Sequence, residues 1–497
     1  MRDRSAGILL HPSSLPGPYG IGDLGPEVDR FLDWCAEAGQ RLWQILPLGP
    51  TGAGNSPYGT LSAFAGNPLL ISPEQLIADH LLPGDALSDA PPFPGDHVDF
   101  GAVSRWKQQL LRDAWSHFRN ETTHPLRSGL EAFVRDPRNT RWLDDWTLFA
   151  AIKGEMEGRQ WRDWPPPLAM RTDLDSARKD LWESIDFHRF VQFVFYRQWE
   201  RVRQEAHRRG IRIMGDVPIY VALDSADVWA NSDRFLLDEN GNPIAVAGVP
   251  PDYFSPTGQR WGNPLYRWDR MRQLDYEWWV ARFGANFRMT DLVRLDHFRG
   301  FAAYWEIPAG NETAQGGKWV EGPGLQFFEQ IRSELGDLPF VAEDLGEITP
   351  DVELLRDSAG LPGMKVLQFA FGEDDSPHHP HNYVRNMVVY TGTHDNDTTR
   401  GWWGHLDARS KHRLQEYLGH CSDSVERQLI RAAYTSVADL VVTPLQDVFG
   451  LGSEGRMNVP GHPDDNWTWR ARHEQFRPED AHRLRDLARL TGRTPEK

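Results

Sequence analysis

Residues 291–301 have the sequence DLVRLDHFRGF, in which a short apolar run ends at a carboxylate, Asp296. A short apolar run bounded by polar residues and glycine is typical of a strand buried on both faces of a parallel sheet. Arg294 and Asp296 are two residues apart, so on a strand their side chains point to the same side. The stretch therefore predicts a buried parallel strand that carries an arginine and an acid on one side at its carboxyl end.

Seven other short apolar runs have the same character and are expected to be the remaining strands. With Leu292–His297, they are Ile8–His11, Leu42–Pro47, Arg212–Pro218, Phe340–Asp344, Met364–Phe369, Val388–Thr393 and Leu440–Pro444. Helical patterns fall between them, at Pro26–Gly39, Phe187–Gly210, Gly324–Gly336, Thr349–Gly360, Ser424–Ala438 and Glu479–Gly492. Strands and helices in alternation predict βαβ units, and eight strands favour a closed (β/α)8 TIM barrel of the α/β class over an open sheet.

Two connections are too long to be simple links between neighbouring elements. Residues 50–186 lie between the second and third strands, and their proline-rich breaks and helix-like stretches predict inserted, mostly helical subdomains. Residues 222–275 follow the third strand and are rich in glycine, proline and aromatic residues. They are expected to contain a long active-site loop, because such loops follow the carboxyl ends of barrel strands. We therefore expect residues 1–497 to form a single catalytic barrel with these two insertions.

Composition argues against several classes of function. The net charge of −17 disfavours nucleic acids and anionic membranes, since both need a basic surface. The apolar runs are too short for a membrane span or a signal-peptide core, and two cysteines in 497 residues suggest a reducing compartment, so a soluble, cytoplasmic protein is expected. Core packing can explain any one of the 21 tryptophans, but so many in an acidic chain favour a carbohydrate ligand, whose rings stack on aromatic side chains.

Four carboxylates lie at the carboxyl ends of predicted strands, where barrel enzymes carry their chemistry. They are Asp216, Asp296, Glu343 and Asp395. One such acid is often a helix cap or a surface charge, but four like charges at one end of a barrel are unfavourable unless function requires them. Periodicity leaves two choices open, because Glu343 and Asp344 point to opposite sides of a strand, as do His394 and Asp395.

An arginine beside Asp296 would keep this carboxylate ionised, as a nucleophile that attacks a sugar must be; a purely structural ion pair is the alternative. A second carboxylate can protonate the departing oxygen and then activate the acceptor, so paired acids on a barrel suit glycoside chemistry. Retention of configuration requires the two carboxyl groups to lie about 5–5.5 Å apart. No second histidine or metal-binding pattern accompanies His394, so no metal is expected.

The order Arg-x-Asp, strand-end Glu, His-Asp resembles the catalytic motifs of the α-amylase superfamily. Longer stretches resemble one branch of it, the amylomaltases (4-α-glucanotransferases or disproportionating enzymes, glycoside hydrolase family 77). These stretches span nearly the whole chain: HPSSLPGPYGIGDLG (11–25), WQILPLGPTG (43–52), NSPYGTLSAFAGNPLLIS (55–72), GDVPIYV (215–221), GVPPDYFSPTGQRWGNPLYRW (248–268), VRLDHFRGF (293–301), AEDLG (342–346), GMKVLQFAF (363–371), PHNY (380–383), TGTHDNDTT (391–399) and RMNVPG (456–461).

The resemblance implies roles by motif position. Asp296 would be the nucleophile, Glu343 the acid/base and Asp395 the third carboxylate. The resemblance thus selects Glu343 over Asp344, and Asp395 over His394, as the catalytic acids. Arg294 and His394 would orient the nucleophile and the sugar hydroxyls. Sugar contacts are also implied for Asp216, for Tyr58, for Asp252, Tyr253, Phe254, Gln259 and Trp261 on a loop over the cleft, and for Asn466. Tyr220 stands where α-amylases carry a histidine, which favours an amylomaltase over an ordinary α-amylase.

The function implied by the resemblance is retaining 4-α-glucan transfer through a covalent ester. The partners would be an α-1,4-glucan donor and a glucose or maltooligosaccharide acceptor, with no cofactor. Glu343 would then need a raised pKa, because it must donate a proton at neutral pH. An α-1,4-glucan hydrolase and a non-catalytic glycan-binding barrel are the alternatives. A nicotinamide-dependent oxidoreductase is disfavoured, because the sequence has no glycine-rich dinucleotide fingerprint.

Overall fold

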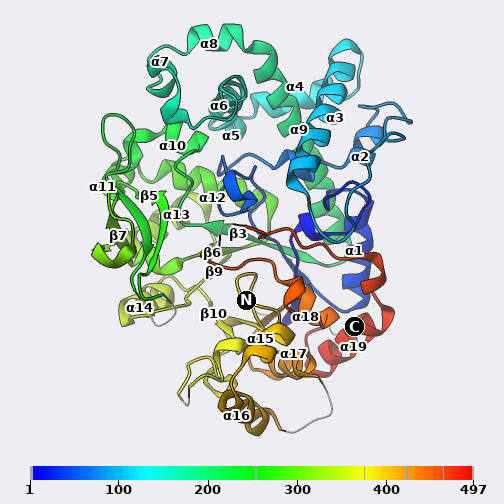
Figure 1. Ribbon diagram of the computed structural model, residues 1–497, viewed down its shortest axis with the longest axis vertical. Coiled ribbons are helices and arrows are strands. Elements are labelled where there is room, and N and C mark those ends of the chain that lie inside the picture. Colours follow the sequence, from blue (N-terminus) through cyan, green and yellow to red (C-terminus); the bar gives the residue numbers. More distant parts are fainter. Residues whose placement is uncertain (1–3, 252–254, 374, 420–423, 463, 495–497) are drawn as a thin grey trace.

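The computed structural model describes residues 4–251, 255–373, 375–419, 424–462 and 464–494. An eight-stranded parallel sheet forms its centre (Figure 1). In pairing order the strands are β10 (Gly363–Val366), β11 (Met387–Tyr390), β12 (Leu440–Pro444), β1 (Ser5–Leu9), β2 (Leu42–Gln44), β3 (Arg212–Pro218), β6 (Leu292–Asp296) and β9 (Phe340–Ala342). A hydrogen bond from the Ala342 N–H to the Pro362 carbonyl (2.8 Å) links the two edges, so the sheet is nearly closed. The predicted (β/α)8 barrel is confirmed.

The barrel strands are buried on both faces, as their unbroken apolar runs predict. Every residue of β1 and of β12 is buried. Gly7 in β1 has no room for a side chain, since a Cβ atom there would collide with the backbone carbonyl of Leu42 in β2. The predicted bounds of β3 and β12 are those observed, whereas β10 stops at Val366 because Leu367–Phe369 turn into a 3-10 helix.

Helices cover the outside of the barrel (Figure 1). They include α1 (Pro26–Glu37), α9 (Trp182–Arg208), α12 (Glu277–Met289), α13 (Gly324–Leu335), α14 (Pro350–Ser358), α17 (Val425–Thr435) and α19 (Pro478–Leu490). The six predicted helices are all present, with ends shifted by at most a few residues. Helix α12 was missed, because its aromatic residues do not form a clear stripe at helical spacing. None of the described helices has the length and apolar character needed to cross a membrane.

Between β2 and β3 the chain leaves the barrel and forms the helices in the upper part of Figure 1. They are α2 (Pro73–Ala78), α3 (Phe100–Asn120), α4 (Arg127–Arg135), α5 (Pro137–Thr140), α6 (Leu143–Glu155), α7 (Pro166–Ala169) and α8 (Asp175–Asp180). Side chains of Ser72, Asp99 and Asp136 cap α2, α3 and α5 by accepting backbone N–H bonds. Helix α6 packs on the long barrel helix α9, which fixes the inserted helices to the barrel.

A second, smaller sheet was not predicted from the sequence. Its four antiparallel strands pair in the order β5 (Gln259–Pro264), β4 (Ala245–Val249), β7 (Ala303–Pro308) and β8 (Lys318–Glu321). Strands β4 and β5 belong to the segment after β3, whereas β7 and β8 belong to the segment after β6. The local sequence hides these strands, because the glycine and proline residues within them are typical of loops. The sheet joins the segments that follow two neighbouring barrel strands.

Candidate active site

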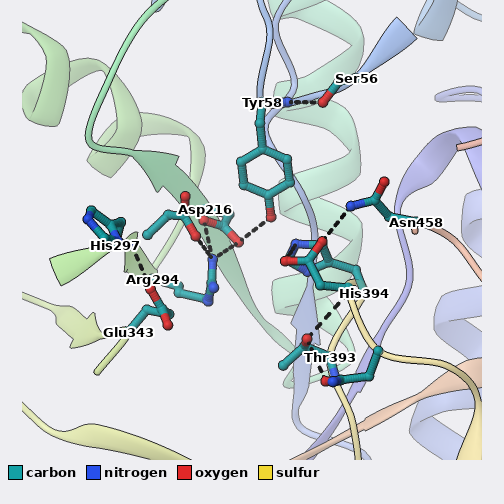
Figure 2. Close-up of polar contacts among 12 residues, drawn as sticks. Ser56, Tyr58, Asp216, Arg294, His297, Glu343, Thr393, His394 and Asn458 are labelled. Atoms are coloured by element: carbon teal, nitrogen blue, oxygen red, sulfur yellow. Dashed lines mark hydrogen bonds and ion pairs between the residues drawn. The ribbon is translucent and has the colours of Figure 1, made fainter. Parts of the chain in front are cut away.

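Asp216, Arg294 and Asp296 form an ion-paired group at the ends of β3 and β6. The register of the two strands places Asp216 level with Arg294. Arg294 Nη1 donates to both carboxylate oxygens of Asp216 (2.9 and 2.8 Å) and to Oδ1 of Asp296 (2.9 Å), as Figure 2 shows in part. Asp216 and Arg294 are buried, whereas the Asp296 side chain is 27% exposed. The predicted placement of Arg294 and Asp296 on one side of the strand is therefore confirmed.

Glu343 lies beside this group, one strand along the barrel. Strands β6 and β9 pair with Leu295 opposite Ala342, so Asp296 and Glu343 follow at the same level. Glu343 accepts hydrogen bonds from the backbone N–H groups of His297 at Oε2 (2.7 Å) and of Leu345 at Oε1 (3.1 Å). His297 has a left-handed backbone with φ of 51°, which is uncommon for a residue other than glycine. The chain thus makes an unusual turn directly after Asp296, at the residue whose N–H binds Glu343.

The neighbouring acid, Asp344, points the other way. Its carboxylate accepts the N–H of Met364 in β10 (2.7 Å) and binds the guanidinium of Arg356 in α14 (2.6 Å). Of the two acids that the sequence left open, Glu343 is therefore the one next to Asp296.

Burial is the main electrostatic influence on the Glu343 and Asp216 carboxyls. It raises the pKa of Glu343 well above its ordinary value; the positive charge of Arg294 opposes this rise and the negative charge of Asp296 adds to it. The direction is the one predicted. Burial also raises the pKa of Asp216 to about 6, although Arg294 and the Tyr58 hydroxyl favour its charged form.

The segment after β11 supplies the third predicted carboxylate. Asp395 Oδ1 accepts from the Asn458 side chain (2.6 Å), and its Oδ2 lies 3.3 Å from Nε2 of the buried His394. Desolvation works against ionisation, but His394 and Asn458 outweigh it and hold the pKa of Asp395 well below its usual range. Tyr58 connects both halves of the site, because its hydroxyl donates to Asp216 (2.9 Å) and its ring stacks on His394 (centroids 5.0 Å) (Figure 2).

Arg456 and Asn458 hold Asp395 in place but were not predicted as site residues. Arg456 Nη2 donates to the Asp395 backbone carbonyl (3.0 Å), and Asn458 binds the carboxylate itself. Both belong to the stretch RMNVPG at 456–461, so the sequence did carry a signal for them.

Asp447 was also missed, and it organises the whole segment that carries His394 and Asp395. It lies in α18 (Leu445–Phe449) and is buried. Its carboxylate accepts the hydroxyls of Thr391 (2.6 Å) and Thr399 (2.7 Å) and the Thr399 N–H (2.7 Å). One carboxylate therefore ties together both ends of residues 391–399. The only sequence signal was its position shortly after the predicted strand Leu440–Pro444.

The predicted loop over the cleft is described only in part. Asp252, Tyr253 and Phe254 lie outside the described residues. Gln259 and Trp261 are on β5, where the Trp261 Nε1 donates to the Gln259 side chain (3.1 Å). Trp261 is 38% exposed, and its ring meets the His297 ring edge-on, with centroids 4.8 Å apart. The structure therefore brings Gln259 and Trp261 to the edge of the carboxylate cluster.

Asn466 bonds to the segment that directly follows Asn458, the side-chain partner of Asp395. It lines a cavity of about 470 Å³ together with Asp397 and Arg456, the residue that binds the Asp395 backbone. Its side-chain amide accepts the Val459 N–H (2.8 Å) and donates to a carbonyl of its own loop (2.7 Å). Asn466 is thus close to the cluster and also stabilises the loop that carries it.

Two histidines lie close to the carboxylates, His394 beside Asp395 and His297 directly after Asp296. His394 is paired with Asp395, and burial lowers the pKa of His297 to about 4, so its ring is neutral at neutral pH. Within the described ranges, no three His, Cys, Asp or Glu side chains are arranged as ligands for a metal ion.

Comparison with known proteins identifies the family to which this site belongs. A family profile described as 4-alpha-glucanotransferase matches residues 10–475. The chain belongs to the 4-alpha-glucanotransferase family. The 4-alpha-glucanotransferase of Thermus thermophilus is 49% identical over 501 residues, covering 99% of each chain. That of Synechocystis sp. is 47% identical over 497 residues, covering 99% of this chain and 98% of the relative.

A solved structure agrees with this assignment. The amylomaltase from Streptococcus agalactiae, solved in complex with acarbose, superposes with a TM-score of 0.95 at 35% identity, covering 99% of this chain and 100% of that one. The predicted resemblance and the predicted enzyme class, a 4-α-glucanotransferase, are therefore confirmed. Neither the glucan hydrolase nor the non-catalytic barrel is favoured by these matches.

Proposed function

We propose that this glucanotransferase works with retention, through an ester between the glucan and Asp296. The observation that carries the proposal is that Asp296, the last residue of β6, and Glu343, which directly follows β9, lie at the same level, with Arg294 bound to Asp296. Neighbouring strands lie about 4.8 Å apart, which supports a carboxyl separation near the ~5–5.5 Å of retaining enzymes. Arg294 pairs with the Asp296 carboxylate (2.9 Å), and burial raises the pKa of Glu343, which favours its protonated form.

The reaction then takes two balanced steps. A carboxylate oxygen of Asp296 attacks the anomeric carbon, the glycosidic bond breaks, and the Glu343 proton passes to the departing sugar oxygen. In the second step the acceptor 4-hydroxyl gives its proton to Glu343 and attacks the same carbon, and the ester to Asp296 breaks. Two inversions at one carbon restore the original α configuration, and Glu343 ends protonated as it began.

The remaining site residues hold the donor sugar. Asp395, fixed by His394 and Asn458, is available to bind hydroxyls of the distorted ring through its half-exposed carboxylate. The partners are an α-1,4-glucan donor and a glucose or maltooligosaccharide acceptor, and the rarity of cysteine supports a cytoplasmic location. The acarbose complex of the related amylomaltase supports a glucan ligand for the cleft.

Product analysis with maltotriose tests this function. Transfer conserves the number of reducing ends, so we expect a ladder of longer and shorter maltooligosaccharides with little increase in total reducing ends. Chromatography of the products and a reducing-end assay follow both quantities in one reaction. A steady rise of reducing ends without longer products would contradict transfer and favour a hydrolase.

Tyr58 is expected to favour transfer over hydrolysis. Its ring lies between the Asp216 and Asp395 sides of the cleft, where it can stack an acceptor sugar and exclude water from the ester. An aromatic contact contributes about 0.5–1.5 kcal/mol, or about 2- to 10-fold in rate. The substitution Tyr58→Ala should lower transfer by about that factor and raise the hydrolysed share of maltotriose. Tyr58→Phe, which keeps the ring and loses only the bond to Asp216, should keep the parent ratio; if both variants keep it, the ring does not control acceptor choice.

Asp447 is expected to be a positioning residue for Asp395. Removing its carboxylate in Asp447→Ala leaves three donors of residues 391–399 unpaired, and misplacement of reacting groups by about 1 Å can cost about 100-fold in rate. We expect kcat of Asp447→Ala to fall by about 10- to 100-fold with little change in KM. Asp447→Asn keeps one acceptor oxygen and should recover part of the lost kcat. Asp439→Ala is the matched control, since it removes a buried carboxylate at the opposite end of β12. Equal losses of kcat in the two Ala variants would show that Asp447 acts only through stability.

A further inference from the structure

A cavity of about 350 Å³ lies outside the carboxylate cluster, where the inserted helices meet the barrel. Its lining comes from four parts of the chain: the loop after β2 (Phe64), the start of α6 (Trp142), the region of α10 (Ala226–Ala230), and α12 (Trp278). Figure 1 shows α6, α10 and α12 together in its upper half. The cavity shares no lining residue with the site described above, and its volume is in the lower part of the range of small-molecule pockets.

Hydrogen-bond donors in the lining are left without partners. Trp142 is 5% exposed, and its indole Nε1 is buried and bonds to no described residue. The same holds for Arg234 Nε, although its Nη2 donates to Glu277 (2.7 Å). A buried donor without a partner costs about 1–3 kcal/mol, so these two groups would gain from a bound molecule that accepts hydrogen bonds.

Acceptors in the lining already hold protein donors. Asp227 accepts the Ala63 N–H (2.7 Å) and is also stabilised by the Trp278 side chain, Asp145 accepts from Arg171 (2.6 Å), and Glu277 accepts from Arg234. A carboxylate has about four lone-pair sites, so each of these acids can accept a further hydroxyl proton. The cavity can therefore both donate to and accept from a ligand, which suits hydroxyl groups.

The charge of the lining selects against an anion. Two guanidinium groups, of Arg141 and Arg234, face three carboxylates, of Asp145, Asp227 and Glu277. A phosphate or carboxylate ligand would add negative charge beside these acids, which is unfavourable. Phe64, Trp142 and Trp278 supply apolar surface for the C–H groups of a sugar ring.

We propose that this cavity binds one or two glucose units of an α-glucan, as a second site outside the catalytic cleft. The choice of glucan among sugars rests on the proposed function, which brings this chain into contact with glucans. A chain held at both places has a raised effective concentration at the cleft, so the second site serves long glucans and not short ones.

Filling the cavity tests this use in the active enzyme. Ala230→Phe introduces a ring into the lining at the end of α10 and alters no residue of the catalytic site. We expect KM for long-chain amylose to rise by about 3- to 10-fold, while kcat and KM for maltotriose stay at parent values. Ala408→Phe, on the exposed start of α16 (Ala408–Leu418), is the matched control and should change neither. An unchanged KM for amylose in Ala230→Phe overturns the proposal.

Direct binding gives an independent result that does not depend on turnover. Crystals of D296N soaked in maltotriose should show sugar in the cavity, and the D296N/A230F double variant should lose it there while keeping sugar in the cleft. Trp142→Phe, which removes only the indole donor, should weaken binding in the cavity by about 2- to 10-fold. Sugar in the cleft with only water or inorganic phosphate in the cavity contradicts the second site. Sugar in the cavity of a D296N protein that still turns over would instead contradict the proposed nucleophile and leave the second site supported.

Discussion

Replacement of Asp296 by Asn should lower kcat by at least about 10⁴-fold, because the amide oxygen cannot form the glucan ester on which both steps depend. The side chain keeps its size, and its oxygen can still accept from Arg294 Nη1, so the fold should be retained. Initial rates on maltotriose, with circular dichroism as the check on folding, measure the two effects separately.

Asp291→Asn is the matched control for this variant. Asp291 precedes the same strand at its other end, where it accepts the Ile213 N–H (2.8 Å) and pairs with His207. It should cost stability and leave kcat near the parent value. Parent-like turnover by Asp296→Asn would rule out the proposed nucleophile.

Replacement of Glu343 by Gln should lower kcat on maltotriose by about 10²- to 10⁴-fold, the usual contribution of a general acid–base group. The raised pKa of Glu343 means that the carboxyl is protonated at pH values below it, so activity should decline as the pH rises through that pKa. In the parent enzyme this decline forms the basic limb of the pH–rate profile. The Gln variant cannot lose a proton there, so its remaining activity should lack that limb.

A donor with a fluoride leaving group separates the roles of the two acids. Fluoride departs without a proton, so Glu343→Gln should still form the ester from a maltosyl fluoride but release it slowly, and mass spectrometry should detect a glucan adduct on the protein. Asp296→Asn should show no adduct. An adduct in both variants, or in neither, would contradict the assigned roles. Asp344→Asn is the control for Glu343→Gln, because Asp344 binds Arg356 and Met364 on the other side of β9.

Local patterns predicted the barrel well. Each strand is a short apolar run and each of the six predicted helices has its own stripe, so the residues that decide these elements are close together in sequence. The acids at the strand ends could be found for the same reason: Asp216, Asp296 and Glu343 come directly at or after a buried run. Helix α12 and the small sheet were missed, since their patterns are weak or depend on pairing between distant segments.

By itself, the sequence determined that this protein is an α/β barrel with acids at the carboxyl ends of its strands, and its long motifs determined the family. Tertiary structure alone decided which acids meet. The register of β3 with β6 joins Asp216 to Arg294, and Asp447 is bonded to a segment that begins 56 residues before it. The pairing of β4 with β7, which joins the segments after two barrel strands, likewise has no local signal. The physical reason is the same in each case: a strand or a turn is selected by the side chains of a few consecutive residues, whereas an ion pair, a buried hydrogen bond or a sheet edge depends on the distance between atoms that only the complete fold brings together.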